Sequence, residues 1–374
     1  MMLLPSGDHR CRIEASSAGE DAAIFASLRA RKQELRKASE LMTQRWRTCQ
    51  CTSSVGIELH DWVRRTAVSW PYVALGAAGG GVYVGDLTSG KLLCGELQAH
   101  PAYTRGQEQD LRLLHGDYDG GGVTALAFDG QMVASGGRDG LARLFEFEHI
   151  PSLGESTLMR SGAPLVCGGV VSCISLLDNT ILTGSTDGSL RYWRRQPSDN
   201  GEYILDCELR FSSAVISLHT AEEAGLAVCG LASGDAAIVA VTGLRVLEQW
   251  SPCSGSHTRS VAIAHGAVIT GSSDGIVRSR RLREDWKLVD VATEMSGDKD
   301  GSGRPSLFAS AADVKLTPAH GGSVVALAER SGGLLVSGAQ DGTVRVWDMF
   351  SEDSNEQPIA QVLYGLAGHK VWLW

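Results

Sequence analysis

A six-residue turn recurs along this chain of 374 residues and constrains the fold more than any other feature. In each copy a Ser or Thr precedes an Asp by four residues, and a Gly follows the Asp directly. The copies span residues 135–140, 183–188, 270–275 and 337–342. Two degenerate copies keep the spacing, one around Asp235 and one with Gly79 in the Asp position. A motif that returns in one register predicts a repeat architecture, in which each copy is one supersecondary unit.

The sequence around each turn indicates strands. Apolar runs such as 123–128 and 132–135 precede a turn, and an alternating run such as 343–348 follows it. A fourth run follows in several copies, as at 91–97 and 286–291. Alternation with a period of two between Gly- and Asp-containing turns is typical of short β-strands. Four strands in about 40–45 residues make one propeller blade, so the repeat predicts an all-β fold.

The copies also resemble the repeats of the WD40 family, over residues 57–374. Trp347-Asp348 matches the dipeptide that ends such repeats, and Trp193 and Phe145 take the Trp position in two other copies. The upstream His of the family has candidates in three places, His115, His257 and His320. The resemblance implies a β-propeller in which His, Ser or Thr, Asp and Trp form a hydrogen-bonded chain inside each blade. The implied structural residues are His320, Ser337, Asp341, Trp347, Ser135, Asp139, Thr183, Asp187, Trp193, Thr270 and Asp274.

Some copies depart from the family pattern, and the C-terminus adds a partial one. Arg280 and Val241 stand where Trp belongs in the fifth and fourth copies. Residues 368–374 begin with Gly-His, which in the family opens a new blade. We therefore expect six recognisable repeats plus a C-terminal stub and favour a seven-blade plan with an incomplete last blade. The alternative is a ring of six blades whose seam is capped by the stub.

Outside the repeats, the sequence predicts three further segments. Residues 1–19 are expected to be a disordered N-terminus, and 20–50 a basic amphipathic helix that precedes the propeller at 51–374. Residues 292–318, which are rich in Gly, Ser and Asp, are expected to be a flexible insertion. The helix either packs on the propeller or docks a partner. Its Ile24-Phe25, Ala38-Ser39 and Trp46, with Leu4-Pro5 upstream, also resemble an F-box, which binds a ubiquitin-ligase adaptor.

Charge and cysteine usage limit the partners and the compartment. The formal net charge is −9. Residues 1–50 carry nine basic and six acidic side chains, so the remaining 25 basic and 37 acidic ones give the body a net charge of −12. This argues against direct nucleic-acid binding, which needs a basic footprint. No apolar run reaches the ~20 residues that span a membrane. The nine cysteines lack disulfide spacing, and Cys94, Cys173, Cys207 and Cys229 are expected to be buried thiols. We expect a cytoplasmic protein, with the nucleus or a plastid as alternatives.

The sequence offers no catalytic, cofactor or metal site. Residues 85–92 match most of a phosphate-binding P-loop, but Leu92 stands where Ser or Thr must hold Mg²⁺, so we interpret them as a hairpin turn. Cys49 and Cys51 lack a second pair of metal ligands at suitable spacing. We therefore expect no enzyme activity, no cofactor and no small-molecule substrate.

The predicted function is a non-catalytic scaffold that presents one propeller face to other proteins. The residue before each anchor Asp lies near one end of the propeller in this family, which makes Arg138, Thr186, Ser273 and Gln340 the candidate partner face. Alternatives are an F-box-like substrate receptor of a ubiquitin ligase and a propeller enzyme. Four arginines, each four residues after an anchor Asp, have two interpretations: stems packed between blades, or a basic ring for an acidic partner. They are Arg143, Arg191, Arg278 and Arg345.

Overall fold

The computed structural model places the chain in two units, Met1–Cys51 and Thr52–Trp374. It describes residues 18–48, 56–101, 122–197, 202–284, 286, 306–309, 312–330, 333–349 and 361–367. The statements below concern these residues. Residues 1–17, most of the expected disordered N-terminus, lie outside them.

The first unit contains one helix, α1 (Ala18–Arg47), close to the expected 20–50. Its surface is charged: Arg36 Nε donates to Glu40 Oε1 at 3.0 Å, one turn further along. At its end the Thr48 hydroxyl donates to the Gln44 carbonyl at 2.9 Å. Leu41 and Met42 are about half exposed, at 50% and 43%. Of the apolar residues expected on one face of the helix, Met42 is exposed and Trp46 is half-buried.

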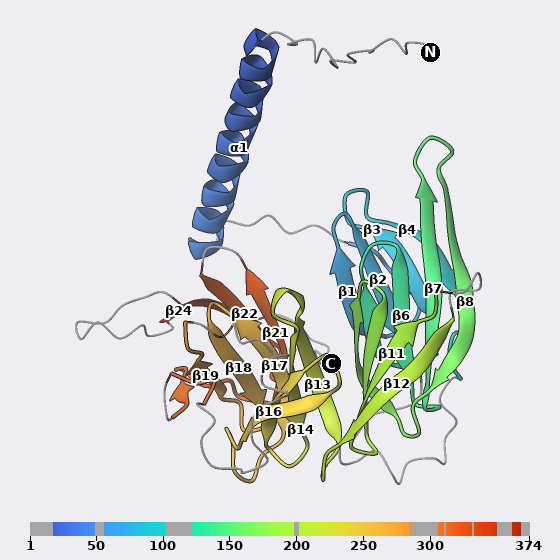
Figure 1. Ribbon diagram of the computed structural model, residues 1–374, viewed down its shortest axis with the longest axis vertical. Helices are drawn as coiled ribbons and strands as arrows, with labels where there is room; N and C mark the ends of the chain where they lie inside the picture. Colours follow the sequence, from blue (N-terminus) through green and yellow to red (C-terminus); the bar gives the residue numbers. More distant parts are fainter. Residues whose placement is uncertain are drawn as a thin grey trace, which may run out of the picture. The chain divides into compact units, whose positions relative to one another are not determined.

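The second unit contains six four-stranded antiparallel sheets, each built from four consecutive strands (Figure 1). Blades 1 to 3 comprise β1 (Val63–Ser69), β2 (Tyr72–Ala77), β3 (Val82–Asp86), β4 (Lys91–Glu96), β5 (Val123–Phe128), β6 (Met132–Gly137), β7 (Leu141–Ile150), β8 (Glu155–Val166), β9 (Val171–Leu177), β10 (Thr180–Ser185), β11 (Ser189–Arg195) and β12 (Tyr203–Arg210). Blades 4 to 6 comprise β13 (Val215–Ala221), β14 (Leu226–Leu231), β15 (Ala236–Ala240), β16 (Arg245–Trp250), β17 (Thr258–Ala264), β18 (Ala267–Ser272), β19 (Val277–Arg281), β20 (Val314–Lys315), β21 (Val324–Arg330), β22 (Leu334–Ala339), β23 (Thr343–Asp348) and β24 (Gln361–Ala367), with a 3₁₀ turn at Glu222–Ala224. The expected all-β propeller is present.

The recurrent Asp-Gly turn joins the second and third strands of a blade. The Gly after the anchor Asp has a positive φ in all four full copies, between 76° and 85°. Side chains are disfavoured in this left-handed region, and glycine is not. The Asp carboxylate accepts from the backbone two residues on, as Asp187 does from the Ser189 amide at 2.9 Å. These two requirements explain why the dipeptide recurs in the sequence.

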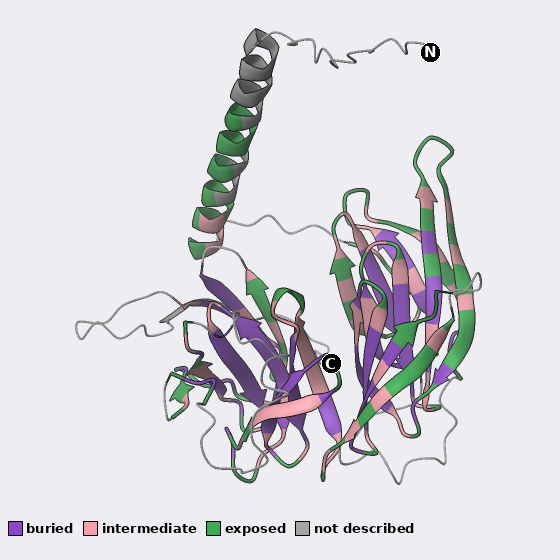
Figure 2. Ribbon diagram, in the orientation of Figure 1, coloured by how far each residue is buried: buried purple, intermediate pink, exposed green. Residues whose placement is uncertain are grey.

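The apolar core lies between the blades. Five clusters of buried side chains each join two successive blades, from blades 1 and 2 to blades 5 and 6. Figure 2 shows the buried residues concentrated on the inner strands, while the β7–β8 hairpin and β12 are largely exposed. Glycines in the second strands allow the sheets to approach closely. A Cβ on Gly136 would lie 2.4 Å from Val171 Cγ1 of the next blade, which no real contact permits.

Hydrogen bonds also connect the same five pairs of neighbouring blades, close to the propeller axis. We call each such contact between neighbouring blades a joint. The Thr124 hydroxyl donates to the Val171 carbonyl at 2.6 Å, and Ser260 does the same to Val324 at 3.0 Å. Ser172 and Ser217 make the equivalent bonds between blades 3 and 4 and between blades 4 and 5. Arg65 Nε donates to the Thr124 carbonyl at 2.8 Å between blades 1 and 2. Each of blades 1 to 5 therefore binds the start of the next one.

The sixth joint, between blades 6 and 1, differs. Val325 and Ala326 occupy the positions of the bridging groups and have no polar side-chain atom. Within the described residues, only Ala326 of the same blade, 3.7 Å away, lies near a Cβ built on Gly338. The innermost strands β21 and β1 also lack the packing that joins the other neighbours in the described part of the chain. The ring is therefore not closed by the contacts that join its other blades.

On blade 1, residues 56–62 pack on the side that faces blade 6. Ile57 lies against Gly85, where it occupies the space of a Cβ. The Asp61 carboxylate accepts from the Gly79 amide at 2.7 Å, and the Ala78 amide donates to the Trp62 carbonyl at 2.8 Å. Both bonds fix the segment on the degenerate first turn.

Two expectations are corrected. Six blades are present, so the seven-blade plan is not supported; residues 368–374, on which it depended, lie outside the described residues. The fourth strand of blade 5 is Val314–Lys315; of the run at 286–291 that the sequence suggested, only Trp286 lies among the described residues. Part of the expected flexible insertion at 292–318 therefore belongs to the blade, and its Leu307 and Phe308 are buried against blades 4 and 5. The fourth strand of blade 5 was not predicted from the sequence because the segment between β19 and β20 is long and polar.

Candidate functional site

Blade 6 brings together the four residues that were predicted to form a chain. His320 Nε2 lies 2.7 Å from Ser337 Oγ, and Trp347 Nε1 donates to the same oxygen at 2.8 Å. His320 Nδ1 lies 2.8 Å from Thr343 Oγ1, which in turn donates to Asp341 at 2.6 Å. Asp341 is 3.9 Å from the imidazole itself, so Thr343 relays the contact. Burial, aided by Arg345, lowers the pKa of His320 and favours its neutral form.

In blade 2 the corresponding histidine is His100. Its Nε2 lies 2.8 Å from Ser135 Oγ, and its Nδ1 lies 3.1 Å from Asp139. Phe145 is in the Trp position and has no N–H to donate. His115, the expected histidine, lies outside the described residues. The signal that was missed is the dipeptide Ala-His at 99–100, which is repeated at 319–320.

A cysteine lies at this place in blade 3, and another contacts the innermost strand of blade 5. Cys167 Sγ is 3.6 Å from Thr183 Oγ1, which also accepts from Trp193 Nε1 at 2.9 Å. Cys253 Sγ is 3.4 Å from Thr258 Oγ1 in blade 5, where Thr270 is buried. His257, a candidate from the sequence, bonds instead to the Ala232 carbonyl of blade 4. Thiols are apolar enough to fill the space that an imidazole fills elsewhere.

Three of the four recurrent arginines pair with the anchor Asp of their own turn. Arg143 donates to Asp139 at 2.6 Å, and Arg191 to Asp187 at 2.9 Å. Arg278 makes the same bond at 2.6 Å, to Asp274, while Arg345 donates to the Pro318 carbonyl. Neither proposed interpretation describes this pairing, which braces the turn.

The electrostatic consequence is seen in the anchor carboxylates. Burial alone would raise the pKa of Asp187, but bonds from Ser189 and Arg191 outweigh it and lower this pKa to about 2. Bonds from Arg278 and Ser272 have the same effect on Asp274. In blade 5 the missing Trp is replaced by Arg280, whose guanidinium carbon lies 4.1 Å from the Phe308 ring centroid.

The candidate partner-face residues lie at the tips of the anchor turns, and all four are half-buried. The Thr186 hydroxyl accepts from the Val170 amide at 3.1 Å, and the Ser273 hydroxyl from the His257 amide at 2.9 Å. The backbone amide of Gln340 donates to the Ser323 carbonyl at 2.9 Å. These bonds fasten the turns to the loops that enter the same blades. Thr186 and Ser273 therefore hold the surface in shape, and Arg138 and Gln340 have the longer side chains.

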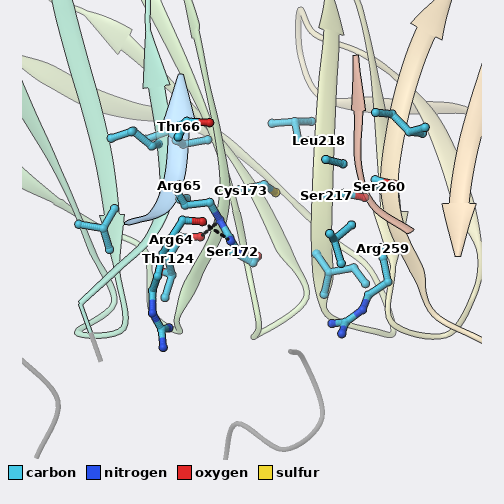
Figure 3. A pocket seen from close by; sticks show the side chains of 18 of the residues that line it. Arg64, Arg65, Thr66, Thr124, Ser172, Cys173, Ser217, Leu218, Arg259 and Ser260 are labelled. Carbon is cyan, nitrogen blue, oxygen red and sulfur yellow. Dashed lines mark hydrogen bonds between the residues drawn. The ribbon is translucent and has the colours of Figure 1, made fainter. Parts of the chain in front are cut away.

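A cavity of about 520 Å³ lies on the propeller axis beside this end. Residues from the innermost strand of all six blades line it, and Gln340 reaches it from its turn. Every innermost strand has a β-bulge after its first residue, which directs the second residue inward. Arg64 and Arg259 are the second residues in blades 1 and 5. Figure 3 shows both extending toward the same end of the channel.

Comparison with known proteins finds a family match in two stretches of the chain. The family model for "WD domain, G-beta repeat" matches residues 109–146 and 313–348, which contain the anchor turns of blades 2 and 6. Two stretches of the chain therefore match WD40 repeats, and its fold is a β-propeller of six blades. Among curated proteins, none matches the sequence. The crystal structure of the computationally designed Ika8 protein is similar in fold, with a TM-score of 0.50 and 22% identity over 85% of this chain and 91% of that one.

In the described part of the propeller and of α1, no three His, Cys, Asp or Glu side chains are grouped so that they could hold a metal ion. No described helix is long and apolar enough to cross a membrane. Of the expected buried thiols, Cys173 and Cys229 are buried, and Cys94 and Cys207 are partly so. Burial raises the pKa of Cys173 to about 12 and that of Cys94 to about 11, so both are protonated at neutral pH.

Proposed function

We propose that this protein is a non-catalytic platform that binds other proteins within a multiprotein assembly, on the propeller end where the anchor turns lie. The observation that carries the proposal is that hydrogen bonds and ion pairs hold these turns in place. Backbone bonds join them to the entering loops at Thr186, Ser273 and Gln340, and ion pairs join Asp139 and Asp187 to their arginines. A surface that is already ordered loses less conformational entropy when a partner binds.

The chemistry of the turn tips supports specific recognition. Equivalent places in four blades carry Arg138, Thr186, Ser273 and Gln340, so the scaffold repeats while the presented groups differ in size and charge. WD40 propellers are generally non-enzymatic, and we propose no catalytic step, cofactor, nucleic acid or small-molecule substrate for this one. We also propose that it acts in the cytoplasm, where its free thiols remain reduced.

The test compares partner capture by the full chain and by two variants. The first variant carries Arg138→Glu and Gln340→Lys on the proposed face. The matched control carries Leu87→Lys and Leu153→Lys, in hairpins at the opposite end, where both side chains are exposed. We expect the first variant to lose partners that wild type and control retain. Loss in the control alone would place binding on the other end and contradict the proposal.

A further inference from the structure

The central channel has a charge opposite to that of the protein. Among the described residues, its lining contains three arginines, Arg64, Arg65 and Arg259, and no Asp, Glu or Lys. The chain as a whole carries 43 acidic and 34 basic side chains. A cavity of about 520 Å³ is in the range of pockets that hold ligands, roughly 300–1,000 Å³. A positively charged cavity in an acidic protein attracts anions, because its low-dielectric walls concentrate the electrostatic potential.

The three arginines have different roles. Arg65 is part of the joint between blades 1 and 2, since its Nε donates to Thr124 O and its Nη1 to Arg64 O at 3.0 Å. Arg64 and Arg259 are instead at the bulge position, where Thr124 and Ser172 make the joints of blades 2 and 3. Figure 3 shows Arg64 and Arg259 directed to one end of the channel from two blades. That end is the one that bears the anchor turns.

We propose that this channel mouth binds an acidic segment of a partner protein, with Arg64 and Arg259 each receiving a carboxylate. The inference rests on the proposed function, because Gln340 belongs to both the turn face and the channel lining. Guanidinium groups bind carboxylates through two parallel hydrogen bonds, and such bonds are stronger away from bulk water. The Thr124 and Ser172 hydroxyls are already bonded to neighbouring carbonyls, so the charged contacts come from the arginines.

The net negative charge of the chain limits which anions can bind at the mouth. The anchor Asp residues lie at the same end, and three of them are paired with arginines of their own turns. A long polyanion such as nucleic acid would extend beyond the channel mouth along a chain whose net charge is −9, and that charge repels it. A short acidic peptide can place two carboxylates in the channel mouth and leave its flanking residues over the turns. Peptide is therefore favoured over a phosphate polymer.

The experiment measures binding of a fluorescein-labelled hexaglutamate peptide to the full chain by fluorescence anisotropy. A hexaglutamine peptide controls for charge, and inositol hexakisphosphate serves as a competing small polyanion. The test variant is Arg64→Gln with Arg259→Gln; the matched control is Arg195→Gln, an exposed arginine on β11 outside the channel. Near-ultraviolet circular dichroism checks that each variant retains its fold, and the single Arg64→Lys change tests the need for a guanidinium.

We expect hexaglutamate to bind wild type and the Arg195 variant, and to weaken at least tenfold in the double channel variant and in high salt. Equal binding by the double variant, or no binding by wild type, overturns the proposal. Binding of inositol hexakisphosphate alone would also overturn it, in favour of a small phosphate ligand. If captured partners depend on Arg138 and Gln340 but not on Arg64 and Arg259, the platform stands and the acidic-segment proposal fails.

Discussion

The hydroxyl oxygen of Ser337 is the atom of blade 6 whose removal we expect to lower the stability of the fold most clearly. Ser337 is fully buried, and its Oγ is bonded to both His320 and Trp347, which are 5% and 0% exposed. In Ser337→Ala, neither ring can recover the bond from water. A buried polar group left without its partner costs about 1–3 kcal/mol, so the loss of two contacts predicts about 2–4 kcal/mol less stability. Urea unfolding, followed by tryptophan fluorescence, measures the change in the free energy of unfolding.

Blade 2 supplies the matched control. Ser135 is equally buried and bonded to His100, but Phe145 has no N–H, so Ser135→Ala leaves only one ring without its partner. We therefore expect Ser135→Ala to cost about 1–3 kcal/mol, less than Ser337→Ala. Adding Trp347→Phe to Ser337→Ala removes one unpaired donor, so the two changes should be less than additive. Equal costs at the two serines, or full additivity with Trp347→Phe, would refute this reasoning.

Three further predictions concern packing, protons and thiols. Gly136→Ala should destabilise the fold by about 1–3 kcal/mol through its clash with the next blade, while Gly338→Ala should be nearly neutral; equal costs would show that blade 6 has a neighbour at its open joint. Burial holds the pKa of folded His320 below the ordinary value of 6.5, so the stability that neutral His320 contributes is complete above pH 6.5 and is lost as pH falls through the folded pKa. The thermal stability of wild type should therefore drop from pH 7 to 5, and that of His320→Gln should drop less. An equal drop in the variant would exclude His320 as the cause. At pH 8 the native Cys173 and Cys94 thiols should react with a disulfide reagent far more slowly than after denaturation, and rapid native labelling mapped to either one would contradict their burial.

The repeat register was enough to predict the blades. Six anchor positions became six turns, and the Gly after each full anchor has a positive φ. Such features are local, since a turn is specified by a few consecutive residues. The same locality explains why Trp347 could be placed beside Ser337: both positions are fixed relative to one turn.

The features that were missed depend on distance in space. His100 was overlooked because residues 102–121 separate it from the strand it precedes. The Asp139–Arg143 pair was visible as a spacing of four residues, yet its geometry needs the two strands that leave the turn. The arginine channel could not be predicted, because Arg64 and Arg259 meet only when the ring brings blades 1 and 5 around one axis. The number of blades was overestimated because a Gly-His dipeptide resembles the start of a repeat whether or not a blade follows.

The central claim is that partners bind the end of the propeller that bears the anchor turns. The opposite end is the alternative, since exposed apolar side chains such as Trp70 and Leu153 lie in its hairpins. The most direct measurement places a photo-crosslinking amino acid at position 138 in one form of the full chain and at position 153 in another, and compares the proteins that each captures in cells. We predict specific crosslinks from position 138 and few from 153. Crosslinks from 153 alone would contradict the account.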